Sequence, residues 1–174
     1  MLTTVLVVIA IAVAVLLAVA ASRPDSFRVE RSTVIQAAPD KVFALINDFH
    51  RWAEWSPWED RDPGMKKTFG GAAAGPGAVY EWEGNAKVGK GRMELLESSH
   101  SKIAIKLDFE KPFEGHNTAE YTMEPAGGGT RVTWAMFGPQ IFMGKLMGLF
   151  FSMDRMIGRD FEAGLAKLKA AAER

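Results

Sequence analysis

The pattern of hydrophobic positions divides the chain into two parts. Residues 2–21 contain no charged side chain, and Thr3 and Thr4 are their only polar members. About 20 residues of α-helix rise roughly 30 Å, which matches the hydrocarbon layer of a bilayer. Because every face of such a helix is apolar, we expect residues 1–22 to form a transmembrane anchor rather than a helix of a protein core.

A cleaved signal peptide is the alternative for this segment, because residues 18–20 have the Ala-x-Ala pattern of a cleavage site. The apolar run is longer than the usual signal core of about 7–15 residues, and no basic side chain precedes it. Arg23, Arg28 and Arg31 follow it, so the positive-inside rule places the rest of the chain in the cytoplasm. We expect a single-pass membrane protein, with export after cleavage as the alternative.

A polar, proline-containing linker at residues 23–26 leads into a domain over residues 27–174. The alternating β-branched residues of positions 27–37 predict a strand. Pro39 then marks the start of a helix, and apolar residues recur at helical spacing to about position 48. A short helical turn over residues 50–55 is expected to follow.

The middle of the domain has the pattern of an antiparallel sheet. The loop-rich stretch after residue 56 contains one short expected strand, at residues 65–69. Five further strands are expected at residues 78–83, 87–97, 102–110, 117–124 and 130–137. Short turns between them indicate antiparallel pairing. Charged and apolar residues alternate along the strands, so one face of the sheet should be wet and the other covered.

The last part of the chain is expected to be helical. Apolar residues form one long stripe at helical spacing from Phe142 to Leu168, which predicts one helix that covers the sheet and an α+β fold. Glycines interrupt this stripe at positions 144, 148, 158 and 164. They would make room for a ligand, allow close packing on the sheet, or allow helix–helix contact through Gly144 and Gly148.

Two stretches have a distinctive pattern: a proline-started amphipathic helix that runs into a tryptophan-rich turn at residues 39–58, and GTRVTW at residues 129–134. Both resemble the helix-grip (SRPBCC) superfamily. This superfamily includes START lipid-transfer domains, birch-pollen-allergen-like proteins and polyketide cyclase/dehydrase-like proteins. Residues 39–58 are similar to its first helix and the tryptophan-rich turn after it, and residues 129–134 (GTRVTW) to its last hairpin. The resemblance covers residues 27–172 and implies a curved antiparallel sheet wrapped around a long C-terminal helix, with a cavity between them. It implies little about activity, because proteins of this fold have many functions.

The implied cavity and the strand alternation together give a set of candidate ligand-binding residues. Side chains expected to point inward from the strands are Tyr80, Trp82, Met93, Phe109, Tyr121 and Trp134. Trp55 and Trp58 would stand at the entrance, and Met147, Phe150 and Met153 would close the cavity from the helix side. Packing in a core is the alternative for each residue, but methionine and aromatic side chains together are typical of apolar binding sites.

One further segment is unusual for its lack of charge. Lys145 is the only charged residue of positions 141–151, which are hydrophobic on nearly every side. On a tethered domain this segment would touch the bilayer next to the cavity mouth. Burial beneath the sheet and the first helix is the alternative.

The composition argues against several kinds of function. Twenty-one basic residues balance 21 acidic ones, so the chain lacks the basic field that nucleic-acid binding requires. It has no cysteine, and its three histidines stand apart, so we assign no metal site, no cofactor and no catalytic nucleophile. Acid–base chemistry, if present, would use polar residues near the expected mouth: Glu54, Glu81, Arg92 and His116.

These observations favour a membrane-tethered binding or carrier protein whose partner is a hydrophobic small molecule or lipid. A polyketide cyclase/dehydratase-like enzyme that uses the same cavity is the first alternative. A protein-interaction module with a vestigial cavity is the second.

Overall fold

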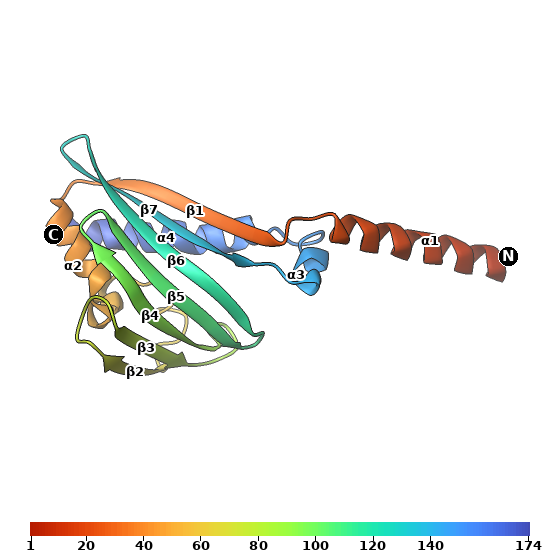
Figure 1. Cartoon of the computed structure of the whole chain (residues 1–174), viewed down its shortest axis with the longest axis horizontal. Helices are drawn as coiled ribbons and strands as arrows, with labels where there is room; N and C mark the ends of the chain where they lie inside the picture. The colour runs from red at the N-terminus through yellow and green to blue at the C-terminus, as the bar shows by residue number, and fades with distance from the viewer.

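The N-terminal helix α1 (Leu2–Ala21) projects away from the rest of the molecule in the computed structural model, which describes all 174 residues (Figure 1). It is the one helix long and apolar enough to cross a membrane. Ala20, at the end nearest the domain, is its only buried residue. The rest of its surface is exposed and almost entirely hydrocarbon.

Seven antiparallel strands form one sheet, in the spatial order β1-β7-β6-β5-β4-β3-β2. The strands are β1 (Ser26–Ile35), β2 (Lys66–Gly71), β3 (Ala78–Glu83), β4 (Lys90–Ser99), β5 (Lys102–Lys111), β6 (Gly115–Ala126) and β7 (Gly129–Pro139). Consecutive strands from β2 to β7 are neighbours, and β1 pairs with β7 along the opposite edge. The expected strands and their antiparallel pairing are confirmed, with ends that shift by up to three residues.

Alternation along the strands gives the sheet one buried and one exposed face, as predicted. In β3, Tyr80 and Trp82 are buried while Glu81 and Glu83 are exposed. Gly91 is the cross-strand partner of Trp82, and a Cβ added there would lie 2.5 Å from the Trp82 ring. A glycine is therefore needed at this position for the indole to lie flat on the inner face.

Three helical segments close the concave face of the sheet: α2 (Pro39–Asn47), the 3₁₀ helix η1 (Phe49–Glu54) and α4 (Met153–Ala172). Pro39 occupies the first turn of α2, where its missing N–H costs nothing. The side chain of Asp48 accepts a hydrogen bond from the His50 N–H and so starts η1. Helix α4 lies lengthwise across the sheet and buries Phe161 and Leu165 against it (Figure 1).

A long C-terminal helix that covers the sheet is confirmed, but its predicted start at Phe142 is wrong. The chain instead forms a short helix, α3 (Phe142–Met147), and then α4. Gly148 ends α3, and the Ser152 hydroxyl accepts a hydrogen bond from the Arg155 N–H at 3.1 Å, which begins a new helix. The apolar stripe runs through both helices, so periodicity alone concealed the break.

Two of the four glycines in this region are sites of close packing. A Cβ at Gly164 would lie 2.7 Å from the Trp134 ring, and a Cβ at Gly158 would lie 2.1 Å from the Arg31 guanidinium. Gly144, in contrast, has only Gln140 of its own segment nearby. The structure thus favours helix–sheet packing at positions 158 and 164, and it shows no helix–helix contact at Gly144.

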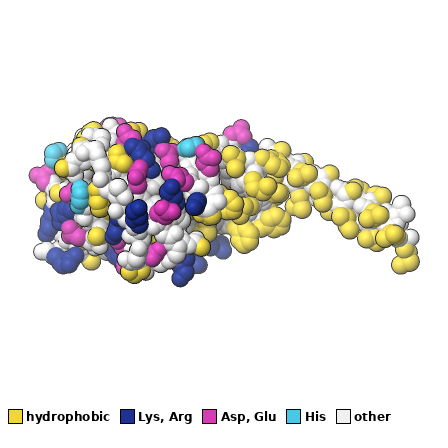
Figure 2. All heavy atoms as spheres, turned by 90° about the horizontal axis from the view of Figure 1, so that it is seen from below, with side chains coloured by type: hydrophobic (Ala, Val, Ile, Leu, Met, Phe, Trp, Pro, Cys, Tyr) yellow, Lys and Arg dark blue, Asp and Glu magenta, His cyan; other side chains and the backbone are white.

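The segment at residues 141–151 is mostly exposed, so the alternative of burial beneath the sheet and the first helix is wrong. Six of its large apolar side chains are exposed: Ile141, Phe142, Met143, Met147, Phe150 and Phe151. Figure 2 shows hydrophobic atoms continuing from α1 onto the domain. Helix α3 packs against the buried end of α1. The ammonium group of Lys145 is buried and pairs with Asp25, in the short connection between α1 and β1.

Candidate functional site

A cavity of about 420 Å³ lies between the concave face of the sheet and the helices η1, α3 and α4. Of its 30 lining residues, 21 are hydrophobic. This volume is within the range of small-molecule sites, about 300–1,000 Å³, and the wall is of the apolar kind that such sites have.

Nine of the eleven residues predicted for the site lie in the cavity wall: Trp58, Tyr80, Trp82, Met93, Phe109, Tyr121, Trp134, Met147 and Met153. Trp55 does not stand at the entrance. Its side chain is only 1% exposed, and its indole N–H donates to the Leu45 carbonyl at 3.0 Å, which makes it part of the core. Phe150 does not close the cavity either, because it follows the end of α3 and is 65% exposed on the outer surface.

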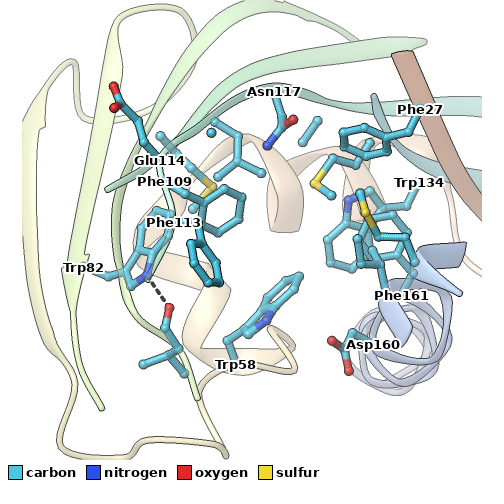
Figure 3. A pocket seen from close by; sticks show the side chains of 18 of the residues that line it. Phe27, Trp58, Trp82, Phe109, Phe113, Glu114, Asn117, Trp134, Asp160 and Phe161 are labelled. Atoms are coloured by element: carbon cyan, nitrogen blue, oxygen red, sulfur yellow. Dashed lines mark hydrogen bonds between the residues drawn. The ribbon is translucent and has the colours of Figure 1, made fainter. Parts of the chain in front are cut away.

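Stacked aromatic rings form one wall of the cavity, next to α4. Trp134 stacks on Phe161 with a centroid distance of 4.1 Å and on Tyr121 at 5.0 Å. Trp58 meets the edge of Trp134 at 5.6 Å. Figure 3 shows Trp134 and Phe161 together on one side and Trp82 on the other. The aromatic contacts make this wall rigid, since each ring restricts the next.

The opposite wall depends on Trp82 and Phe109. Their rings meet edge to face at 5.7 Å. The Trp82 N–H donates to the Val88 carbonyl at 3.0 Å, which fixes the indole in place (Figure 3). Only carbon atoms of this indole remain available to a molecule in the cavity.

Two polar atoms in the aromatic wall have no hydrogen-bond partner within the protein. They are the hydroxyl of Tyr121 and the indole N–H of Trp134, and both are buried. Burial raises the pKa of Tyr121 well above its ordinary value, so the phenol keeps its proton and remains a donor. An unsatisfied buried donor costs about 1–3 kcal/mol, which a suitable acceptor would recover.

The charged groups in the wall are all acidic. Glu59 and Asp160 are largely shielded from solvent, and Glu114 is exposed and points away from the cavity (Figure 3). Glu59 accepts a hydrogen bond from Lys67 at 2.5 Å, and Asp160 pairs with Arg61, but neither basic residue lines the cavity. Burial raises the pKa of Asp160 despite the opposing effect of Arg61.

The residues predicted for acid–base chemistry lie outside the cavity. Glu54 pairs with Arg51 at 2.8 Å on the surface of η1. Arg92 pairs with Glu94 at 2.8 Å on the exposed face of the sheet.

Glu81 and His116 are also on the surface and not in the cavity wall. His116 hydrogen-bonds Asp108 at 2.8 Å, and this contact raises the pKa of the imidazole. None of the four residues lines the cavity, because alternation turns the strand residues among them outward. His116 lies beside the β5–β6 turn, between the wall residues Gly115 and Asn117, but its side chain is exposed.

Sequence patterns did not reveal several residues of the cavity wall. Phe113 lies in the turn between β5 and β6, where alternation gives no direction. Asn117 directs its amide toward the cavity from β6 (Figure 3). Asp160 precedes Phe161 on α4, at the edge of the apolar stripe that we followed. Its position next to a stripe residue was the one sequence signal that Asp160 could be partly buried.

Comparison with known proteins places the domain in a family. The family model of polyketide cyclase/dehydrase and lipid transport proteins matches residues 26–173. No curated protein matches the chain at a significant level.

Solved structures with this fold include protein CV1439 from Chromobacterium violaceum, at 19% identity and a TM-score of 0.59, with 87% of this chain and 99% of that chain covered. The solution structure of KanY has 19% identity and a TM-score of 0.63 over 86% and 99% of the two chains. The di-domain ARO/CYC protein StfQ from the steffimycin biosynthetic pathway has 13% identity and a TM-score of 0.61 over 85% of this chain and 51% of its own. At such identities the structures show a shared fold, while the family match covers nearly the whole domain. The chain belongs to the polyketide cyclase/dehydrase and lipid transport family.

Proposed function

We propose that this protein is a membrane-tethered binding protein for a neutral, mostly apolar small molecule, which it holds in the cavity of residues 27–174. The observation that carries this proposal is the open 420 Å³ cavity with its methionine and aromatic wall. Burial of apolar ligand surface would supply most of the affinity, at about 25 cal/mol per Å². A protein-interaction module has less support, because a vestigial cavity would be filled by side chains.

The polar atoms of the wall support a preference for neutral ligands. The Tyr121 hydroxyl and the Trp134 N–H lack acceptors, and a carbonyl, ether or hydroxyl oxygen on the ligand would supply one. No lysine or arginine lines the cavity, whereas Glu59 and Asp160 do. A carboxylate or phosphate would therefore enter an apolar space without a cation and next to acidic groups, which is unfavourable.

The proposed tether is α1, which is long and apolar enough to span a bilayer. Arg23, Arg28 and Arg31 follow it, which favours a cytoplasmic domain. Protease treatment of sealed, right-side-out vesicles tests this orientation, because a cytoplasmic domain stays intact. Edman sequencing of the membrane-extracted protein distinguishes the anchor from a cleaved signal peptide.

Native mass spectrometry of the full chain in detergent, followed by organic extraction, tests the binding proposal directly. We expect a defined neutral molecule to copurify with the protein. Binding of 1-dodecanol and of dodecanoate at pH 8 then tests the charge preference, with the alcohol expected to bind at least about tenfold more tightly, or roughly 1.4 kcal/mol. A protein that purifies empty and binds neither probe would contradict the proposal.

A lining variant and a matched surface variant make this experiment specific. Phe109 lines the cavity, whereas Leu96 is an exposed apolar residue of similar type on the neighbouring strand. We expect Phe109→Ala to weaken dodecanol binding and Leu96→Ala to leave it unchanged. Equal effects of the two substitutions would indicate that the probe binds to the surface and not to the cavity.

An enzyme of the cyclase/dehydratase type is the second candidate. Two observations favour it: the family includes polyketide cyclases and dehydrases, and the cavity wall contains both Asp160, whose pKa is raised, and the neutral phenol donor of Tyr121. A carboxyl group with a raised pKa can act as a proton donor or acceptor. Incubation with a poly-β-ketone thioester analogue tests this role, since each dehydration releases one water and Asp160→Asn would abolish that mass loss.

A further inference from the structure

The mouth of the cavity opens toward the end of the domain from which α1 projects. Phe113, in the turn between β5 and β6, lines the cavity and is 75% exposed. Met143 and Met147 of α3 and its N-cap residue Ile141 line it and are exposed as well. Figure 1 places both the β5–β6 turn and α3 at the α1 end of the domain. The entrance is therefore bordered by apolar side chains on both sides.

Apolar side chains also surround this mouth without lining the cavity. Phe142, Phe150 and Phe151 are exposed, the last two at 65% and 69%, and none belongs to the cavity wall. These three residues and the four mouth residues are all exposed and apolar, and we refer to them as the hydrophobic area; Figure 2 shows hydrophobic side chains gathered on the domain next to α1. A cluster of seven large exposed apolar side chains is unusual on a surface that faces water. Such a cluster marks a site of contact with a protein or a membrane.

The foot of α1 fixes the position of this area relative to the helix. Ala20 is fully buried, and α3 packs against this end of α1. Lys145, the only charge in the segment at 141–151, is buried and neutralised by Asp25. The α3 surface therefore presents no free charge next to the last turn of a helix whose length matches the hydrocarbon layer.

The geometry points to lipid as the occupant of this surface. The lipid belongs to the leaflet from which α1 emerges toward the domain. We infer that Phe113, Phe142, Phe150 and Phe151 insert among the lipids, so that the cavity opens into the bilayer and not into water. This inference rests on the proposed tether and deepens it. Continuity with α1 favours lipid over a protein partner, because a spanning α1 already holds α3 at the membrane surface.

Two arginines next to the hydrophobic area suit this placement. Arg23 follows α1 and Arg155 lies in the first turn of α4, and neither forms an ion pair within the protein. Lipid phosphates at the interface would provide partners for both. A ligand dissolved in the acyl layer would then reach the cavity without crossing water.

Site-directed spin labelling tests the inference. Because the chain has no cysteine, a single introduced cysteine carries the only spin label. Single variants Phe113→Cys, Phe151→Cys, Ala10→Cys and Leu96→Cys of the full chain would be labelled and reconstituted in phosphatidylcholine vesicles. Leu96 is an exposed apolar residue near the end of β4, which points away from α1 (Figure 1). Ala10 reports the middle of α1.

We expect nitroxides at positions 113 and 151 to collide more often with oxygen than with a water-soluble nickel complex, and the nitroxide at 96 to show the reverse. Position 10 should be the most oxygen-accessible of all. If position 10 is deep while 113 and 151 are in water, or are shielded from both reagents by a protein contact, the inference fails and the tether stands. If position 10 is itself in water, the tether fails too.

A transfer assay tests the route of entry with a readout independent of depth. The paired variant Phe150→Ser/Phe151→Ser leaves the cavity wall intact, because neither residue lines it. We expect it to slow the uptake of Nile red from vesicles severalfold while its equilibrium affinity for Nile red in detergent stays unchanged. Leu96→Ser should alter neither quantity. An unchanged uptake rate in the paired variant would overturn entry from the bilayer.

Discussion

Gly164→Ala tests whether close packing of α4 on the aromatic wall shapes the cavity. The added Cβ would lie 2.7 Å from Cζ3 of Trp134 and 3.0 Å from Cδ of Pro57. Real Cβ atoms do not approach other atoms at 2.7 Å, so either the indole or the helix must move. The indole has little freedom, because Phe161 and Tyr121 stack on it at 4.1 and 5.0 Å.

Two opposing contributions decide the size of the effect. Alanine favours the helix over glycine by about 1 kcal/mol. Overpacking a well-filled site costs about 1–3 kcal/mol. We expect the steric contribution to win, with a net loss of roughly 1 kcal/mol in the free energy of unfolding. Gly144→Ala is the matched control, since its Cβ would meet only the flexible Gln140 side chain at 3.4 Å.

Urea unfolding of the full chain in detergent micelles measures this difference. All five tryptophans lie beyond α1, so their fluorescence reports the domain and not the anchor. We expect the two glycine variants to differ by about 1–2 kcal/mol, with Gly164→Ala the less stable and its dodecanol binding altered. A Gly164→Ala protein as stable as Gly144→Ala would refute the idea that this glycine is needed for contact with Trp134.

Three further substitutions test individual features of the site and of α4. Tyr121→Phe should leave the empty protein as stable or about 1 kcal/mol more stable, because it removes an unsatisfied hydroxyl, yet weaken binding of dodecanol severalfold in a fluorescence titration. Burial raises the pKa of Asp160, so its protonated form stabilises the fold and stability falls as pH rises through the folded pKa. Asp160→Asn should therefore raise the urea midpoint at pH 7, with the gain disappearing below about pH 4; an equal gain at both pH values would contradict this account. Arg31→Met removes the ion pairs to Asp154 and Glu162, and we expect faster hydrogen exchange in the first turns of α4 with little change in the exchange of the β-strands.

The strands of this fold could be predicted because one face of the sheet is wet. Alternation such as that of Tyr80 and Trp82 with Glu81 and Glu83 identifies both the strand and its inner face. The break between α3 and α4 could not be predicted from the sequence. Hydrophobic side chains follow the same pattern whether they lie on an apolar surface, in a cavity wall or in the core. Gly148 and Ser152 mark the break, but a glycine and a serine near each other also occur within longer helices.

The same limit explains the successes and errors in the site. Residues on strands, such as Met93 and Trp134, were placed in the wall because register fixes their direction. Trp55 was misplaced because it follows η1, where neither helical nor strand periodicity indicates which way a side chain points. Its direction depends on a hydrogen bond to the Leu45 carbonyl, in the preceding helix. Phe113 was missed for a similar reason, because a turn has no inner face.

The short connection between α1 and β1 limits where this protein can act. Only residues 22–25 separate the two elements, and four extended residues reach at most about 14 Å. When α1 spans a bilayer, β1 therefore begins within about 14 Å of the end of α1, so the domain stays at one leaflet and cannot travel to a second membrane. Such a protein would search for its ligand by lateral diffusion and hand it to neighbours in the same plane, rather than ferry it through the aqueous phase.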